Sequence, residues 1–301
     1  MQPRKRLGVS AIIVSAFGFC IYPILGKYVF AGGASLPTVL FVRFGSAAIV
    51  FWAMYLWKNG RPRLRVKAWL ILLAMGGLGY AGMAGLYLWS VRFIPASLAS
   101  LVFYSFPLLV TIISILTHQE VLSLKKILGL VSSCLGLLFV LGINFEVANL
   151  MGLLIAFSAA SVHSVNIIAG NRILKTLSPL LSTAIITSGA ALTYGLIELS
   201  SGFTWELSLA TWMGIAGISL FSTIIAMLAF YKGMQLVGAS TASILSMLEP
   251  VMTSVLAYLF LGERLTYVQG VGGSLVILGG IIVARIPVSE KVVPEYIIKQ
   301  F

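Results

Sequence analysis

Long apolar runs divide this 301-residue chain, and their length restricts its possible folds more than any other feature. A helix that crosses a hydrocarbon core of about 30 Å needs roughly 20 predominantly apolar residues. The sequence therefore predicts ten membrane-spanning helices, over residues 8–30, 37–57, 68–91, 96–118, 126–143, 149–170, 180–200, 209–231, 239–261 and 267–286. We expect an all-α polytopic membrane protein, because the short loops between these runs leave no room for a soluble catalytic domain.

The composition agrees with a membrane environment. Hydrophobic residues make up 59% of the chain and charged residues only 9%, whereas about a quarter of a soluble domain is charged. The first apolar run reaches about Phe30, which is longer than the roughly 7 to 15 apolar residues of a signal peptide, so we expect it to stay as the first helix. The expected location is the bacterial inner membrane, with lipid headgroups balancing the net charge of +12.

The basic residues indicate how the helices are oriented. Short loops rich in Lys and Arg stay on the cytoplasmic side. With a cytoplasmic N-terminus and ten crossings, that side collects sixteen of the twenty basic residues, the other side three, and Arg43 lies within the second span. The three on the other side are Lys27, Arg92 and Arg264. The sequence therefore predicts that both termini are cytoplasmic.

The sequence also repeats itself at an offset of 143 residues. Residues 96–100 (ASLAS) align with 239–243 (ASTAS), and the aligned single positions include Pro107 with Pro250, Glu120 with Glu263 and Gly136 with Gly279. Because each unit crosses the membrane five times, the second unit must be inverted relative to the first, as in many transporters. We predict a first unit over residues 1–145, a second over 146–287 and a cytoplasmic tail over 288–301.

Two motifs in these units resemble a known family. The runs 248–250 (LEP) and 259–265 (LFLGERL) are similar to the end of an EamA unit of the drug/metabolite transporter superfamily, and residues 107–120 resemble the same motif in the first unit. The resemblance implies a ten-helix exporter or exchanger of small metabolites, similar to the YddG-type amino-acid exporters. The first unit departs from the pattern, since Phe106 replaces the acidic residue before proline and Gln119 replaces a glycine. Two symmetric intramembrane carboxylates are therefore not expected.

Small and helix-breaking residues follow one face of the fourth and ninth spans. Such a stripe either packs tightly against another helix or lines a path. A proline removes a backbone donor and leaves a carbonyl that needs a partner within the membrane. We take Ser243 and Ser246 as candidates for a substrate cavity, and Pro23, Pro107 and Pro250 as candidate gating or helix-break positions.

Two charged residues lie within spans. Glu249 falls about halfway along the ninth span, where a charge is costly, so it should face the interior of the bundle or be protonated. It is either a structural anchor or a substrate or proton site. Arg43 could attract a substrate carboxylate, but we favour a structural pairing of Arg43 with Glu249.

Titratable and aromatic side chains supply the remaining candidates. His163 and Asn166 share a face of the sixth span, where they either form interhelical hydrogen bonds or contact substrate. Tyr80 and Tyr87 share a face of the third span, and with Tyr104 they either pack in a core or form the wall of a cavity for an apolar or aromatic amino acid. The distribution of histidines and cysteines predicts no metal site, and we expect no cofactor.

These observations favour a secondary transporter for amino acids or related small metabolites, acting as a monomer by alternating access, with nucleic acid excluded as a partner. A drug or other metabolite exporter of the same fold is the alternative, and a channel or an intramembrane enzyme would belong to another class. An enzyme is not expected, because the chain contains no aspartate, no G-x-S-x-G and no H-E-x-x-H motif. The absence of a G-x-x-x-x-G-K-[ST] motif speaks against ATP hydrolysis.

Overall fold

The computed structural model describes residues 3–120, 123–142, 149–203, 205–262 and 264–286, all of them in helices or short connections. Ten helices in these residues are long and apolar enough to cross a membrane, which confirms the number predicted from the sequence. The predicted tail over 288–301, the boundary between residues 145 and 146, and Glu263 lie outside the described residues.

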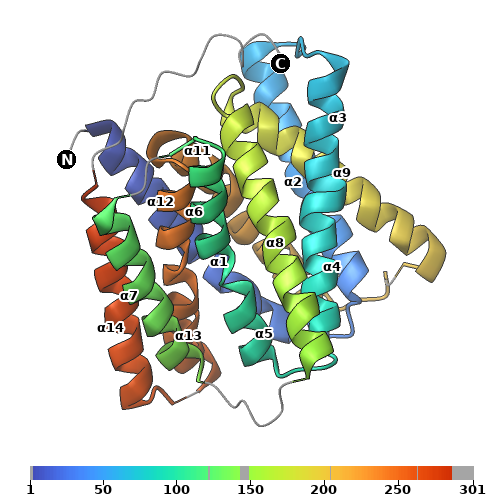
Figure 1. The fold of residues 1–301 in the computed structure, drawn as a ribbon. Coiled ribbons are helices and arrows are strands. Elements are labelled where there is room, and N and C mark those ends of the chain that lie inside the picture. Colours follow the sequence, from blue (N-terminus) through green and yellow to red (C-terminus); the bar gives the residue numbers. More distant parts are fainter. Residues whose placement is uncertain (1–2, 121–122, 143–148, 204, 263, 287–301) are drawn as a thin grey trace.

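The first half of the chain forms five of these spans (Figure 1). The third span continues through a π-helical segment, η1, and the fourth is divided in two. The elements are α1 (Pro3–Ala31), α2 (Leu36–Asn59), α3 (Val66–Ala74), η1 (Met75–Tyr80), α4 (Ala81–Ser90), α5 (Ala96–Phe103), α6 (Phe106–Leu116) and α7 (Leu124–Leu141).

The second half repeats this order. Its third span contains the π-helical segment η3, and its fourth span is divided at Met247, which matches Tyr104 at the offset of 143. The elements are α8 (Leu150–Ile173), α9 (Pro179–Ser201), α10 (Leu209–Ser219), η3 (Leu220–Ile225), α11 (Ala226–Val237), α12 (Ala239–Ser246), α13 (Leu248–Leu261) and α14 (Tyr267–Ala284).

Local sequence signals account for where the helices begin. The Ser35 hydroxyl accepts a hydrogen bond from the Thr38 amide at the start of α2, and Ser178 does the same for α9; each of these helices also carries a proline in its first turn. Thr266 and Gln269 form a reciprocal capping box at the start of α14. These caps satisfy amide groups that have no partner within the helix.

Contacts between the halves follow a pseudo-twofold pattern. Helix α7 packs on α14 and α2 packs on α9, so these two pairs map onto themselves when the halves are exchanged. The first helix of each half packs on the third span of the other half, α1 on α11 and α8 on α4. The two halves are therefore interlocked and share one core, which is centred on large buried side chains such as Ile12, Met227 and Tyr231.

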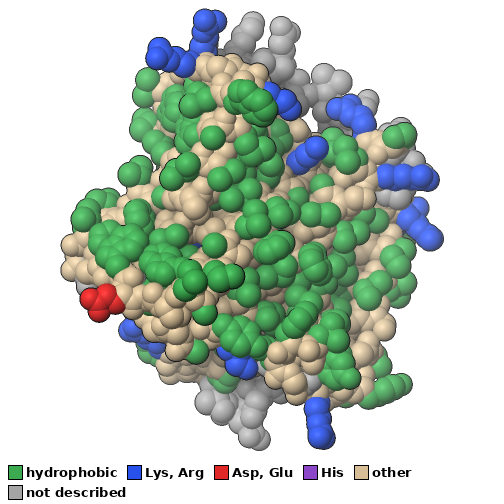
Figure 2. Space-filling view, turned by 180° about the vertical axis from the view of Figure 1, so that it is seen from behind, with side chains coloured by type: hydrophobic (Ala, Val, Ile, Leu, Met, Phe, Trp, Pro, Cys, Tyr) green, Lys and Arg blue, Asp and Glu red, His purple; other side chains and the backbone are tan. Residues whose placement is uncertain are grey.

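The surface divides along the direction of the helices. Figure 2 shows apolar side chains over the middle of the molecule, with Lys and Arg gathered mainly at the end where α1 begins and α14 ends in Figure 1. Large exposed hydrophobic residues occur along most of the spans, which suits contact with lipid tails. The fold therefore matches the composition, with an apolar belt between polar ends.

Candidate functional site

A cavity of about 480 Å³ lies inside the bundle. Its volume falls within the range of about 300 to 1,000 Å³ that is typical of small-molecule sites. Its wall includes Leu36 at the start of α2, Leu88 near the end of α4 and Leu141 at the end of α7. These helix ends share the lower face in Figure 1, so the cavity extends from the middle of the bundle toward that face.

Arg43 on α2 is one of two charged residues among the described residues of the cavity wall, and its side chain is held in place. Its Nε donates a hydrogen bond to Thr223 Oγ1 at 2.5 Å, and its Nη2 donates to the Ser222 carbonyl at 2.9 Å. Both partners belong to η3. Since a π turn changes the pairing of backbone carbonyls, η3 can offer a carbonyl to the side chain of another helix.

The second charged residue in the wall is Glu249, in the first turn of α13. The Tyr104 hydroxyl, at the break between α5 and α6, lies close enough to its carboxyl group to interact with it. A carboxylate in the first turn also interacts favourably with the helix dipole. The expected direct pairing of Arg43 with Glu249 is not formed among the described residues, since Arg43 binds η3 instead, and only a longer-range electrostatic interaction joins the two groups.

Aromatic rings form much of the remaining wall. The His163 ring lies 4.8 Å from the Phe106 ring, 5.4 Å from Phe103 and 6.1 Å from Tyr80, measured between centroids. Its Nδ1 is buried with no hydrogen-bond partner among the described residues. The Tyr87 hydroxyl shares a 2.6 Å hydrogen bond with Ser100, which also lines the cavity.

The structure brings most of the predicted site residues together. The predicted residues that line the cavity are Tyr80, Tyr87, Tyr104, His163, Ser246, Glu249, Pro23 and Pro250. Whether any of them contacts substrate stays a prediction. Pro23 lies within the continuous helix α1, whereas Pro250 follows the break between α12 and α13 by three residues.

Three predicted residues lie elsewhere. Asn166 packs against η1, because a β-carbon at Gly79 would lie 2.6 Å from its side-chain carbonyl oxygen. Ser243 is fully buried, and its hydroxyl donates to the Ser240 carbonyl within α12. Pro107 is buried in the first turn of α6. These three are absent from the wall of this cavity, and whether they contact substrate stays untested.

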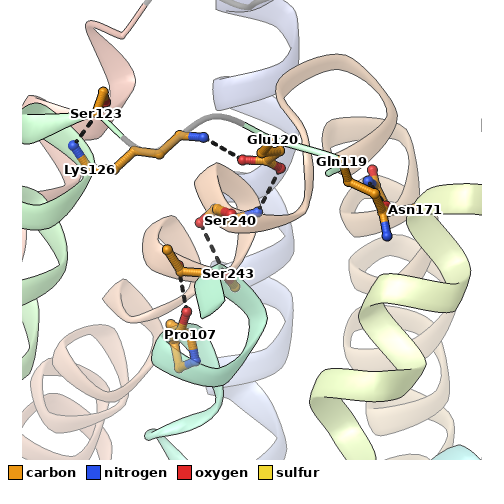
Figure 3. A network of polar contacts seen from close by, with 9 residues as sticks. Pro107, Gln119, Glu120, Ser123, Lys126, Asn171, Ser240 and Ser243 are labelled. Atoms are coloured by element: carbon orange, nitrogen blue, oxygen red, sulfur yellow. Dashed lines mark hydrogen bonds and ion pairs between the residues drawn. The ribbon is translucent and has the colours of Figure 1, made fainter. Parts of the chain in front are cut away.

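Polar contacts join the helices at the opposite face (Figure 3). Glu120 Oε1 accepts a hydrogen bond from the Ser240 amide at the start of α12, and Lys126 donates to the other carboxylate oxygen. Asn171 on α8 donates to the Gln119 side chain at 2.9 Å. The connection between α6 and α7 therefore ties α12 and α8 together, away from the cavity opening.

Several residues in or near the site were not predicted from the sequence. Tyr22, Phe44 and Phe103 line the cavity, but in apolar runs nothing distinguishes them from aromatic residues that face lipid or core. Thr223, the hydrogen-bond partner of Arg43, is 180 residues away from it in the chain. The signal available for Glu120 was its alignment with Glu263 in the repeat.

Comparison with known proteins supplies independent information. The model of the EamA-like transporter family matches residues 6–142 and again residues 150–285. The curated relatives include the uncharacterized transporter YyaM of Bacillus subtilis, 26% identical over 79% of this chain and 80% of its own length. Another is an uncharacterized transporter of Archaeoglobus fulgidus, 25% identical over 93% of this chain and 97% of its own length.

The fold also occurs among solved structures. One crystal structure superposes with a TM-score of 0.79 over 94% of this chain and 98% of its own chain, at 20% sequence identity. Similarity at that level of identity concerns the arrangement of the helices alone.

Proposed function

Because the chain belongs to the EamA-like transporter family, with the family's domain in each half, we propose that it is a secondary transporter working by alternating access. The proposed substrates are neutral amino acids, aromatic or otherwise, or related small metabolites, as in YddG-type exporters. The observation that carries this proposal is the cavity, which combines aromatic walls with one guanidinium and one carboxyl group and extends to one face.

The proposed orientation places both termini and the Glu120 contacts on the cytoplasmic side. It is supported by the gathering of basic residues at that end of the molecule. The cavity then opens to the outside, as in a carrier that has just released an exported substrate. We propose a bacterial inner membrane as the location and a monomer as the working unit, because a single chain encloses the cavity.

The test is uptake into liposomes that contain the purified protein. Radiolabelled neutral amino acids are screened with and without a pH gradient, and exchange against unlabelled amino acid is measured. A carrier gives saturable flux and counterflow, whereas a channel gives neither. If the protein takes up an apolar drug but no amino acid, it is a drug exporter of the same fold. Among the alternatives to an amino-acid transporter, the aromatic cavity wall favours such a drug exporter.

A further inference from the structure

Opposite charges line the cavity without forming a direct ion pair. Arg43 comes from α2 in the first half of the chain and Glu249 from α13 in the second. Both are described residues, and no ion pair joins them. Two opposite charges in a largely apolar wall attract strongly when little water separates them, so holding them apart requires other contacts.

Those contacts are present for Arg43. Two of its five N–H groups are used by Thr223 and the Ser222 carbonyl, and its guanidinium carbon lies 4.7 Å from the centroid of the Tyr22 ring. Its remaining N–H groups have no hydrogen-bond partner among the described residues. The side chain is 9% exposed and lines the cavity, so its position is fixed while part of its hydrogen-bonding capacity is unused.

Glu249 is held in a complementary way. Its carboxyl group lies near the Tyr104 hydroxyl, which is neutral, and no ion pair joins it to a cation among the described residues. The break before α13 places it at a helix N-terminus. A carboxylate positioned like this can accept a hydrogen bond from a substrate ammonium group without first breaking an ion pair.

The aromatic rings in the cavity wall suit an apolar side chain. The centroid of the Phe44 ring lies 5.2 Å from the guanidinium carbon of Arg43. Tyr80, Phe103 and His163 form a contiguous aromatic surface. The cavity volume of about 480 Å³ exceeds that of one amino acid, so a molecule of that size fits with water.

We propose that Arg43 binds the carboxylate and Glu249 the ammonium group of one zwitterionic substrate, whose side chain lies on the aromatic wall. This inference rests on the proposed transport function and adds a rule of selection. A substrate carrying only one charge would leave the other protein charge buried without a partner, which is costly. The cavity therefore rejects the amine and the acid that correspond to an amino acid it accepts.

The experiment measures inhibition of labelled phenylalanine uptake by three competitors: phenylalanine itself, phenethylamine, which lacks the carboxylate, and 3-phenylpropionate, which lacks the ammonium group. The wild-type protein should prefer phenylalanine by roughly ten-fold to a hundred-fold over either analogue. In Arg43→Gln the discrimination against phenethylamine should fall about ten-fold, and in Glu249→Gln the discrimination against 3-phenylpropionate should fall similarly. Thermal stabilisation of each variant by the same compounds gives a second readout that does not need turnover.

Glu198→Gln is the matched control. Glu198 is fully buried on α9 and accepts hydrogen bonds from Ser35 and Thr38, but it does not line the cavity. Its variant should keep the wild-type order of the three competitors. If Arg43→Gln and Glu249→Gln bind phenylalanine more weakly yet keep the wild-type ratios of inhibition among the three competitors, the inference is overturned.

Other outcomes separate this inference from the proposed function. If wild-type protein transports a betaine or another zwitterion but no amino acid, the amino-acid assignment fails and the selection rule stands. If its substrate proves to be a simple cation or anion, the rule fails while a transport function remains.

Discussion

The Gly272 carbonyl oxygen lies 2.5 Å from the point that a β-carbon at Gly136 would occupy, and the Gly136 carbonyl lies 2.6 Å from the corresponding point at Gly272. Gly129 and Gly279 repeat the relationship one heptad away on α7 and α14. The helix pair thus crosses backbone against backbone, as small residues permit within membranes.

Gly272→Ala should destabilise the protein by about 1–3 kcal/mol, because a methyl group there would meet backbone atoms that cannot move aside easily. The measurement is thermal unfolding of the detergent-solubilised protein. Gly270→Ala is the control two residues away on the same helix, since its β-carbon would have no neighbour within 4 Å. Equal melting temperatures for the two variants would contradict the close crossing.

Thr223→Val should weaken substrate affinity without removing a charge. The change leaves Arg43 Nε unpaired in a buried place, at a cost of about 1–3 kcal/mol, and frees the guanidinium to turn toward Glu249. Binding is measured by titration of the purified protein. Thr187→Val serves as the comparison, because within the described part of the chain that buried hydroxyl bonds to the Thr183 and Ala184 carbonyls of its own helix. If Thr187→Val lost as much substrate affinity as Thr223→Val, the loss could not be assigned to the bond between Thr223 and Arg43.

Glu120→Ala should loosen the packing of the helices at the face opposite the cavity opening, where Glu120 contacts Ser240 and Lys126. The variant loses both the bond to the Ser240 amide and the pairing with Lys126. In a background without Cys20 and Cys134, a Ser243→Cys probe, whose parent residue is 0% exposed, should react faster with a thiol reagent. Glu206→Ala removes an exposed carboxylate and should not change the rate. If the Ser243→Cys thiol reacts at an unchanged rate in Glu120→Ala, contacts other than those of Glu120 keep this face closed.

Ala84→Trp should abolish transport in a protein that still folds. Ala84 lines the cavity, so the indole would take up space in which we place the substrate. Uptake and melting temperature are measured together. Ala210→Trp adds the same ring at an exposed position and should transport normally. Normal uptake by Ala84→Trp would show that the substrate does not pass through this cavity.

Reporter tags at the two termini should lie on the same, cytoplasmic side. An even number of spans would place both ends on the same side, and the basic residues at one end predict that this side is cytoplasmic. The measurement is the activity of tags that work on one side of the membrane only. Opposite locations for the two ends would contradict ten crossings.

The positions of the helices were predictable because the thickness of the bilayer sets the length of an apolar run that crosses it, about 20 residues. The confirmed predictions are the ten spans, the presence of two EamA repeats and the assignment to a transporter family instead of an enzyme. The resemblance carried by residues 248–265 pointed to the same family.

Side-chain partners were less predictable, because residues far apart in the sequence determine them. The sequence around Leu220–Ile225 does not indicate a π turn. Arg43 was therefore expected to bind Glu249, whereas it binds η3. Asn166 shares a helix face with His163 in sequence, yet a close approach by Gly79 buries it in the packing against η1. Hydropathy and spacing do not determine such approaches between helices.

The packing of α1 on α11 and of α8 on α4 has a consequence for how such a chain can arise. A single five-helix unit would leave the face of its first helix without the surface on which it packs here. Such a unit would have to meet a copy of itself inserted upside down before either could complete its fold. Fusing the two copies into one polypeptide sets both insertion directions during synthesis and makes the encounter of the halves intramolecular.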